Sequence, residues 1–205
     1  MKLTTLFHPH FIIKYYLLRD IQKISRSFRF SGTAMDIGCG NKPYLSLFPK
    51  LASYHGIKYK NYSHNKVLHR AKPDFFFSKA YKKNLRLPFP SESFDHIFSF
   101  QVAEHHPNPM KHIEEALRVT KKNGTILLTV PFIWALHEEP HDYFRYTEYS
   151  LRTLFTAKHC RILSIKKQGS FPSTICMLAM DYALELIRRK NAYSLFGLIS
   201  SPFLL

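Results

Sequence analysis

The residues best suited to chemistry in this 205-residue chain lie in two short segments. The first is a turn at 38–41 (GCGN) that follows the short apolar run 33–37. Two glycines let the backbone turn sharply and approach a ligand, and a helix with Pro43 in its first turn would add unpaired N–H groups. A GxGxxG dinucleotide fingerprint needs its third glycine where Pro43 stands, which argues against NAD or FAD.

The second segment, 137–147 (HEEPHDYFRYT), places two histidines and an aspartate just after a strong strand pattern. An imidazole has an unperturbed pKa suited to general-base work near neutral pH. His137 or His141 is therefore a candidate catalytic base, with Asp142 orienting one of them. The alternative is a structural lid that Asp142 and Arg145 tie together.

Strands alternating with helices must position these segments. Apolar patterns predict strands at 33–37, 53–59, 74–77, 94–100, 125–130 and 161–166, and helices at 11–30, 110–119 and 144–155, the last beginning near Thr147. Asn123-Gly124 predicts the end of the second helix. This alternation predicts an α/β fold, with a mostly parallel sheet and helices on both faces, whose ligands bind beyond the carboxyl ends of the strands.

The net charge and the cysteines indicate which partners and which cellular compartment to expect. The net charge is +16, and the stretch 50–86 holds ten Lys or Arg residues against one acid, Asp74. Such a surface attracts phosphates, nucleic acid or anionic lipid heads, unless it is only a solvated face. The three cysteines lie far apart, which argues against a zinc site or a disulfide framework and suits a reducing cytoplasm.

We divide the chain into an N-terminal amphipathic helix region (1–32), a central domain (33–170) and an apolar C-terminal tail (171–205). The start of the chain has no small-residue cleavage site, so no signal peptide is predicted. The tail is too short and too interrupted by Pro202 to span a bilayer, and we expect it to pack on the domain or on a partner. The basic helix packs on the domain or touches a membrane surface, so we expect a cytoplasmic protein, with the inner face of a membrane as a peripheral contact.

Four ordered motifs resemble those of class I S-adenosylmethionine-dependent methyltransferases. They lie at 36–40 (DIGCG), 87–95 (LPFPSESFD), 101–109 (QVAEHHPNP) and 114–124 (EEALRVTKKNG). The segment 137–147 is similar to an H-x-x-P-x-D-x-x-R-x-T element of the methyltransferase type 11 branch. The resemblance implies a single Rossmann-like domain that binds S-adenosylmethionine.

The resemblance also implies a set of cofactor-binding residues. The methionine half of the cofactor would be lined by Asp36, Gly38, Cys39 and Gly40. Pro88 and Phe89 would flank the adenine edge, and Phe100 and Gln101 would contact the cofactor from the end of the fourth strand. Lys58 stands where the family usually has an acid that accepts hydrogen bonds from the ribose, and an ammonium group cannot accept one. Cys39 fits a small turn filler better than a nucleophile. Glu104 and His105 fit structural hydrogen bonding and a substrate role equally well, and no residue is assigned to a metal.

The implied activity is methyl transfer from S-adenosylmethionine to a small-molecule, lipid-linked or sugar-type acceptor. Losing the ribose acid would weaken cofactor binding by roughly ten- to a hundredfold, which leaves a non-catalytic relative as an alternative. The basic stretch 50–86 suggests a nucleic-acid methyltransferase as a further alternative, although the sequence contains no recognisable RNA-binding module. The sequence names neither the acceptor nor the oligomeric state.

Overall fold

The computed structural model describes residues 10–59, 72–77, 86–156, 158 and 160–189. Their contacts separate two units. Residues 21–166 form a compact α/β unit, and the described residues 10–20 and 167–189 belong to the other. The motifs identified in the sequence all lie in the α/β unit.

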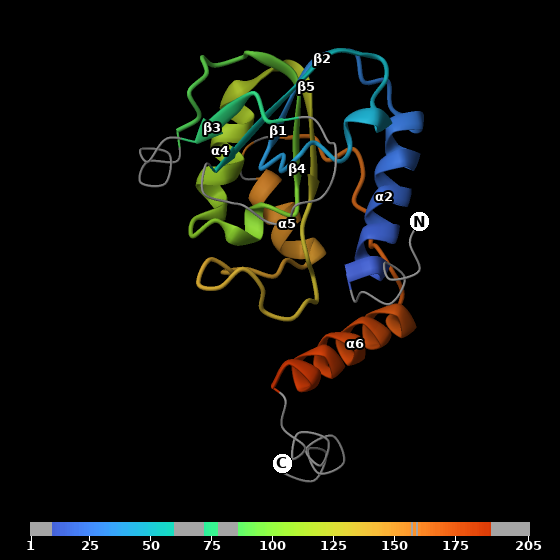
Figure 1. The fold of residues 1–205 in the computed structure, drawn as a ribbon. Helices are drawn as coiled ribbons and strands as arrows, with labels where there is room; N and C mark the ends of the chain where they lie inside the picture. Colours follow the sequence, from blue (N-terminus) through green and yellow to red (C-terminus); the bar gives the residue numbers. More distant parts are fainter. Residues whose placement is uncertain (1–9, 60–71, 78–85, 157, 159, 190–205) are drawn as a thin grey trace. The chain divides into compact units, whose positions relative to one another are not determined.

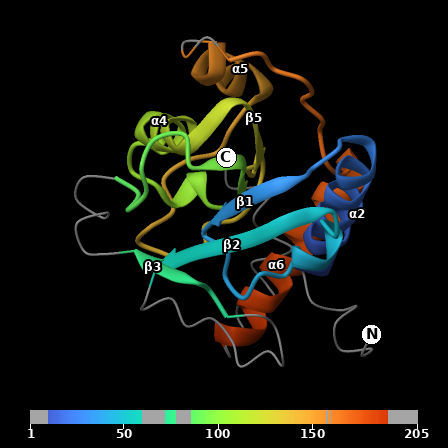
Figure 2. The same ribbon diagram turned by 90° about the horizontal axis from the view of Figure 1, so that it is seen from above.

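Five parallel strands form the sheet, in the order β3-β2-β1-β4-β5 (Figure 1). They are β1 (Gly32–Ile37), β2 (Leu51–Tyr59), β3 (Phe75–Phe77), β4 (Phe94–Phe100) and β5 (Thr120–Thr129). The chain steps outward from β1 to β2 and β3, and then crosses back to β4 on the other side of β1 (Figure 2). The predicted mostly parallel, Rossmann-like sheet is therefore confirmed, and the crevice where such sheets bind ligands lies at the carboxyl end of β1.

The described helices agree with most of the predicted ones. They are α2 (His10–Ser27), α4 (Pro109–Val119), α5 (Glu148–Thr156) and α6 (Phe171–Arg189), with 3-10 turns η1 (Leu45–Leu47) and η2 (Ala103–His105). Asn108 caps α4 by accepting a hydrogen bond from the backbone N–H of Lys111 at 3.1 Å. Thr147 Oγ1 accepts one from Ser150 N at 3.1 Å, so the predicted start of α5 near Thr147 is confirmed.

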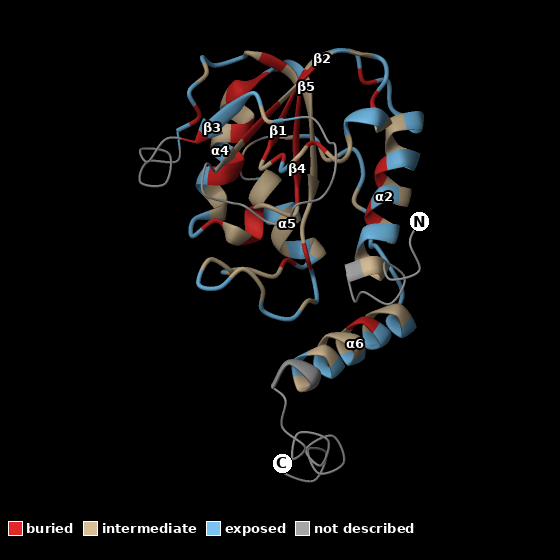
Figure 3. Cartoon of the chain, in the orientation of Figure 1, coloured by how far each residue is buried: buried red, intermediate tan, exposed pale blue. Residues whose placement is uncertain are grey.

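Each face of the sheet has its own apolar layer. On one face Met35, Ile57 and Ile97 pack with Ala116 and Val119 of α4. The other face is aromatic: the Phe98 ring stacks on Phe48 at 4.4 Å and meets Phe30 edge to face at 5.5 Å. Figure 3 shows the buried positions concentrated in β1 and β4, which lie at the centre of the sheet. The rigid centre thus carries the two strands whose carboxyl ends hold the candidate site.

The helix predicted after the glycine turn is absent. The chain makes irregular turns from Gly38 to Tyr44 and forms only η1 before Pro49. Lys42 adopts a left-handed φ of 51° just before Pro43, and residues 43–50 form only turns around η1. The unpaired N–H groups expected there are therefore not supplied by an α-helix.

Two further predictions are wrong. Asn123-Gly124 does not end a helix: α4 already ends at Val119, and these residues form an irregularity inside β5 where the register with β4 shifts. The left-handed φ of 61° at Asn123 explains the false signal, because bulges and helix ends favour the same residues. Residues 161–166 are not a strand; Leu163 is 50% exposed, so the alternating pattern there belongs to a surface segment.

The apolar C-terminal region begins with α6, in which Phe171 is 80% exposed and Ile175 50% exposed. Within the described ranges no helix is both long enough and apolar enough to cross a bilayer. The predictions for residues 190–205, including the interruption at Pro202, fall outside the described residues, as does most of the basic stretch 50–86.

Candidate active site

Three loops meet at the carboxyl edge of the central strands. Gly38, directly after β1, lies against the Val102 side chain from the loop after β4. The β4 loop is joined in turn to the segment after β5, because Tyr143 N donates to Glu104 O at 2.9 Å. His105 Nδ1 donates to His141 O at 2.7 Å. Sequence segments 36–40, 101–109 and 137–147 therefore form one continuous surface.

The glycine turn is shaped for close approach. Gly38 has a φ of 77°, and a Cβ there would collide with Val102, so the β1 and β4 loops can meet only at a glycine. Gly40 also has a positive φ, 52°, but a Cβ there would have no atom within 4 Å. Gly38 is thus required by packing, whereas Gly40 is exposed and open to a ligand.

Burial shifts the titration of the acid in this turn. Asp36 is 2% exposed, and its carboxylate accepts a 2.6 Å hydrogen bond from the Tyr54 hydroxyl. Burial raises the pKa of Asp36 to about 7, although the Tyr54 bond and the charge of Lys42 oppose the shift. Burial also raises the pKa of the Cys39 thiol to about 12, which agrees with a turn filler and not with a nucleophile.

Lys42 is a site residue that the sequence reading missed. Its side chain is buried, and its Nζ donates to Asp74 Oδ2 at 2.5 Å and to Tyr54 O at 3.3 Å. Asp74 accepts a second bond, from Gly56 N at 2.7 Å. Burial alone would raise the pKa of Asp74, but the bonds from Lys42 and Gly56 outweigh it and lower the pKa. The one sequence signal was Asp74 itself, a lone acid in a basic stretch.

The remaining cofactor candidates lie in different surroundings. Lys58 is partly exposed near the end of β2, opposite Phe76 of β3. Pro88 is exposed, whereas the Phe89 ring packs edge to face on Phe94 at 5.2 Å and so serves the core. Among the described residues, the ring contacts of Phe89 are with the core, and neither Pro88 nor Phe89 has a hydrogen bond to the glycine turn.

Phe100 and Gln101 do adjoin the turn. The Phe100 ring meets Tyr44, from the β1 loop, at 4.7 Å. Gln101 takes a left-handed φ of 55° while its N–H donates to Thr129 O at 2.9 Å. This bend at the end of β4 directs the following residues, Val102 to His105, across the top of β1.

The segment after β5 is held by a two-pronged ion pair. Arg145 donates to both oxygens of Asp142, at 2.6 and 2.7 Å, and the Asp142 side chain is 1% exposed. The Arg145 guanidinium lowers the pKa of Asp142 to about 2. Arg145 also donates to the carbonyls of Trp134 and Ala135, at 3.1 and 3.0 Å, so this pair ties the segment together as the lid alternative requires.

Asp142 also orients a histidine, as the catalytic alternative requires. Its Oδ2 accepts from His137 N at 3.0 Å and lies 3.3 Å from His137 Nδ1. The His137 ring stacks on Trp134 at 4.6 Å. His141 is placed differently, with Nδ1 3.2 Å from the Tyr143 hydroxyl, so it is His137 that Asp142 positions.

Glu104 and His105 lie against His137. Glu104 is fully buried, at 0% exposure, and burial raises its pKa to about 8. His105 Nε2 lies 3.9 Å from Glu104 Oε1 and 3.5 Å from Glu138 Oε2, and its ring meets that of His137 at 4.9 Å. The sequence offered Glu104-His105 as an ambiguous pair, and nothing in it showed that His137 completes a cluster.

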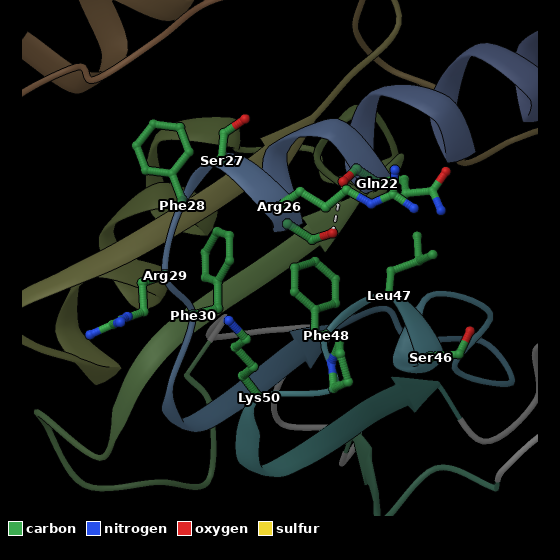
Figure 4. A pocket seen from close by; sticks show the side chains of 12 residues that line it. Gln22, Arg26, Ser27, Phe28, Arg29, Phe30, Ser46, Leu47, Phe48 and Lys50 are labelled. Atoms are coloured by element: carbon green, nitrogen blue, oxygen red, sulfur yellow. Dashed lines mark hydrogen bonds between the residues drawn. The ribbon is translucent and has the colours of Figure 1, made fainter.

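A separate pocket of about 440 Å³ lies at the opposite edge of the sheet (Figure 4). Its lining includes Arg26 and Phe30, before β1, and Phe48 and Lys50, before β2. These residues mark the amino ends of the strands, whereas ligands of parallel α/β sheets bind at the carboxyl ends. The pocket is therefore separate from the candidate site.

Residues 35–128 match the family model of a methyltransferase domain, type 11. The matched range includes the glycine turn, all of β4 with the loop after it, and α4. This part of the chain, a little under half of its length, is similar to that methyltransferase domain. The segment 137–147 lies beyond the matched range, so its role depends on its contacts with the domain.

Solved structures support the same fold for the methyltransferase domain. A structure titled as a SAM-dependent methyltransferase from Aquifex aeolicus superposes with a TM-score of 0.53 and 21% identity, covering 79% of this chain and 93% of that one. The [4+2]-cyclase SpnF superposes with a TM-score of 0.56 and 22% identity, over 80% of this chain and 66% of that one. Similarity at this level shows the fold, and the two titles name different reactions.

One curated relative is a tRNA (carboxymethyluridine(34)-5-O)-methyltransferase of Schizosaccharomyces pombe. It is 26% identical over 125 residues, which cover 58% of this chain and 49% of the relative. The chain thus spans about half the length of the curated relative it matches.

Proposed function

We propose that the chain transfers the methyl group of S-adenosylmethionine to an oxygen atom of a small-molecule, lipid-linked or sugar-type acceptor. The observation that carries this proposal is the junction of the three loops, in which the methyltransferase glycine turn adjoins the β4 loop and, through it, His137. A cofactor site and a histidine oriented by a carboxylate thereby share one edge of the sheet.

The residues present fit the cofactor at the glycine turn and fit it less well at β2. A Cβ on Gly40 would meet no atom within 4 Å, and Asp36 is buried at the end of β1; these residues would hold the methionine end. Lys58 brings no acceptor for the ribose hydroxyls, so we expect weaker binding than with a carboxylate there. When bound, S-adenosylmethionine supplies an activated methyl group, which an oxygen nucleophile takes as a neutral thioether departs.

The protein then has to align the acceptor, exclude water and remove a proton. His137, held by Asp142 and Trp134, is the group we assign to the proton of an acceptor hydroxyl, and His141 is the second candidate. Exposed apolar side chains follow β5, with Phe132 62%, Ile133 47% and Leu136 70% exposed. They favour an acceptor with an apolar part, such as a lipid-linked sugar, over a fully polar one.

Calorimetric titration with S-adenosylmethionine is the first test, because saturable binding is required for any methyl transfer. Turnover with radiolabelled cofactor then compares the parent with His137→Ala and His141→Ala. We expect His137→Ala to lower turnover by roughly 10²-fold or more, with little change in cofactor affinity. Unchanged turnover in both variants would leave segment 137–147 with only a structural role.

A nucleic-acid acceptor is the second candidate, and the similarity to a tRNA methyltransferase favours it together with the net charge of +16. Electrostatic binding to RNA weakens steeply as salt rises, because each neutralised phosphate releases counterions. Methylation of total tRNA, together with a steep salt dependence of tRNA binding, would replace the first proposal by this one.

A further inference from the structure

Among the residues that the structure describes, a buried carboxylate in the β4 loop lacks a hydrogen-bond partner. Glu104 is 0% exposed, and neither Oε1 nor Oε2 has a hydrogen-bond partner. An unpaired carboxylate in a buried position costs several kcal/mol, so such groups are normally paired or bind a metal. His105 Nε2 lies 3.9 Å from Glu104 Oε1, close enough for an ion pair but too far for a hydrogen bond.

Two imidazoles share this space, and their hydrogen bonds determine which nitrogen is free. His105 Nδ1 lies 2.7 Å from the carbonyl oxygen of His141, which can only accept, so Nδ1 carries the proton. His137 Nδ1 lies 3.1 Å from Ala135 O and 3.3 Å from the Asp142 carboxylate, which also only accept. In the neutral form of each ring, the lone pair is therefore on Nε2.

These three residues converge. One ligand atom from each of Glu104, His105 and His137 lies within 4.8 Å of the other two. Oxygen acceptors behind ligating histidines, such as His141 O and the Asp142 carboxylate here, are the usual outer shell of metal sites, since they fix the ring and increase its basicity. The buried carboxylate, the two oriented imidazoles and their outer partners together form a built site.

We propose that Glu104, His105 and His137 bind one divalent transition-metal ion at the acceptor side of the active site. Two imidazoles and one carboxylate favour ions such as Zn²⁺, Mn²⁺ or Fe²⁺ over Mg²⁺, which prefers an all-oxygen shell. The protein supplies three ligands, so positions remain for water or for an acceptor oxygen.

A catalytic role for the ion rests on the proposed methyl transfer. Binding of the ion to Glu104, His105 and His137 does not depend on that function. A hydroxyl coordinated at an open position would lose its proton to solvent at a lower pH, as metal-bound water does. His137 would then act as a ligand, and the ion would take over the base role that we assigned to this histidine.

Metal binding is tested on the full chain after dialysis against EDTA, without cofactor or acceptor. Zn²⁺, Mn²⁺ and Mg²⁺ are titrated separately by calorimetry, and Mn²⁺ also by electron paramagnetic resonance. We expect one Zn²⁺ or Mn²⁺ per chain, a raised melting temperature, and weaker binding of Mg²⁺.

The variants are chosen to separate this site from the other histidines, since the chain has twelve in all. Glu104→Gln and His105→Ala should each weaken Zn²⁺ and Mn²⁺ binding by roughly tenfold or more. The matched control is His141→Ala, which removes an imidazole from the same segment but keeps the carbonyl that orients His105. Glu104→Gln has nearly the same shape as the protonated carboxyl that burial favours, so the metal-free variant should fold about as stably as the parent.

Equal metal affinity in Glu104→Gln, His105→Ala and the His141→Ala control would mean adventitious binding to surface histidines and would overturn the proposal. Failure to bind Zn²⁺ or Mn²⁺ would overturn it as well. Binding of S-adenosylmethionine by Glu104→Gln is measured in parallel. A variant that loses the metal and keeps the cofactor separates this proposal from the methyltransferase function.

Discussion

The two sides of the candidate site hold their charges differently. On the acceptor side, the Asp142 carboxylate, 1% exposed, is matched by two bonds from Arg145 and one from the backbone of His137. On the cofactor side, Asp36 is also buried but receives one hydroxyl bond, from Tyr54, and its pKa rises to about 7. Both carboxyls are buried, which disfavours their charged forms. Only Asp142 has a guanidinium partner, and this pair makes its charged form the favoured one.

This difference bears on function. A cationic ligand would stabilise the charged form of a buried carboxyl that has no cationic partner. A carboxyl already paired with arginine instead stabilises the fold. By this criterion Asp36 and Glu104 are the groups that we propose for ligand binding, and Asp142 is the one that we propose for positioning His137. Replacing Asp142 should therefore destabilise the ligand-free protein, whereas replacing Asp36 should stabilise it.

The largest effect is expected from Asp142→Ala. It leaves the Arg145 guanidinium, 24% exposed, without its ion-pair partner, so the free energy of unfolding should fall by about 3 kcal/mol. Urea denaturation measures this change. The matched control is Glu148→Ala, which breaks the exposed pair with Arg152 and should cost only about 0.5 kcal/mol. Equal losses in the two variants would contradict the architectural role of Asp142.

Asp36→Asn should stabilise the ligand-free protein in a pH-dependent way. The folded-state pKa of Asp36 is raised from 3.8 to about 7, so its contribution is most favourable below pH 3.8 and is lost as the pH rises toward 7. The parent should lose about 2–3 kcal/mol of unfolding free energy from this group between pH 5 and pH 8, and the asparagine variant should not. Denaturation at the two pH values measures the difference, which would vanish if Asp36 ionised normally.

The same logic explains what could and could not be predicted from the sequence. The core strands and α4 were predictable because apolar runs are local signals. The irregular connection after Gly38 was not, because it includes a partly buried ion pair between Lys42 and Asp74, which are 32 positions apart. A sequence does not show that distant residues neutralise each other.

The candidate site was predictable to a similar extent. The glycine turn and segment 137–147 were identified from residue types and order, and their proximity follows from the parallel topology. The cluster of Glu104 and His105 with His137 was not identified, since an unpartnered carboxylate can be recognised only after every nearby donor has been placed. The prediction of a strand at 161–166 was wrong because an alternating pattern does not reveal whether the edge of a neighbouring strand is available for pairing.

Lys42→Met tests the ion pair between Lys42, which lies in the irregular connection after the glycine turn, and Asp74. Asp74 would lose its ammonium partner, but its side chain is 38% exposed and water can replace part of the interaction. We therefore expect a loss of about 1–2 kcal/mol in the free energy of unfolding, smaller than for Asp142→Ala. Lys58→Met, which removes a partly exposed lysine of the neighbouring strand, serves as the control and should change stability by less than about 0.5 kcal/mol.

The smallest effect, and the one most specific to the cofactor, is expected from Lys58→Asp. Lys58 lies near the end of β2, where the sequence resemblance places an acid that accepts hydrogen bonds from the ribose. The substitution introduces an acceptor and removes a positive charge from the vicinity of a cationic cofactor. S-adenosylmethionine should bind about tenfold more tightly, which corresponds to about 1.4 kcal/mol. Lys58→Met separates the two contributions, because it removes the charge without adding an acceptor. Calorimetry at equal ionic strength compares the three proteins, and equal affinities for Lys58→Asp and Lys58→Met would show that the position makes no ribose contact.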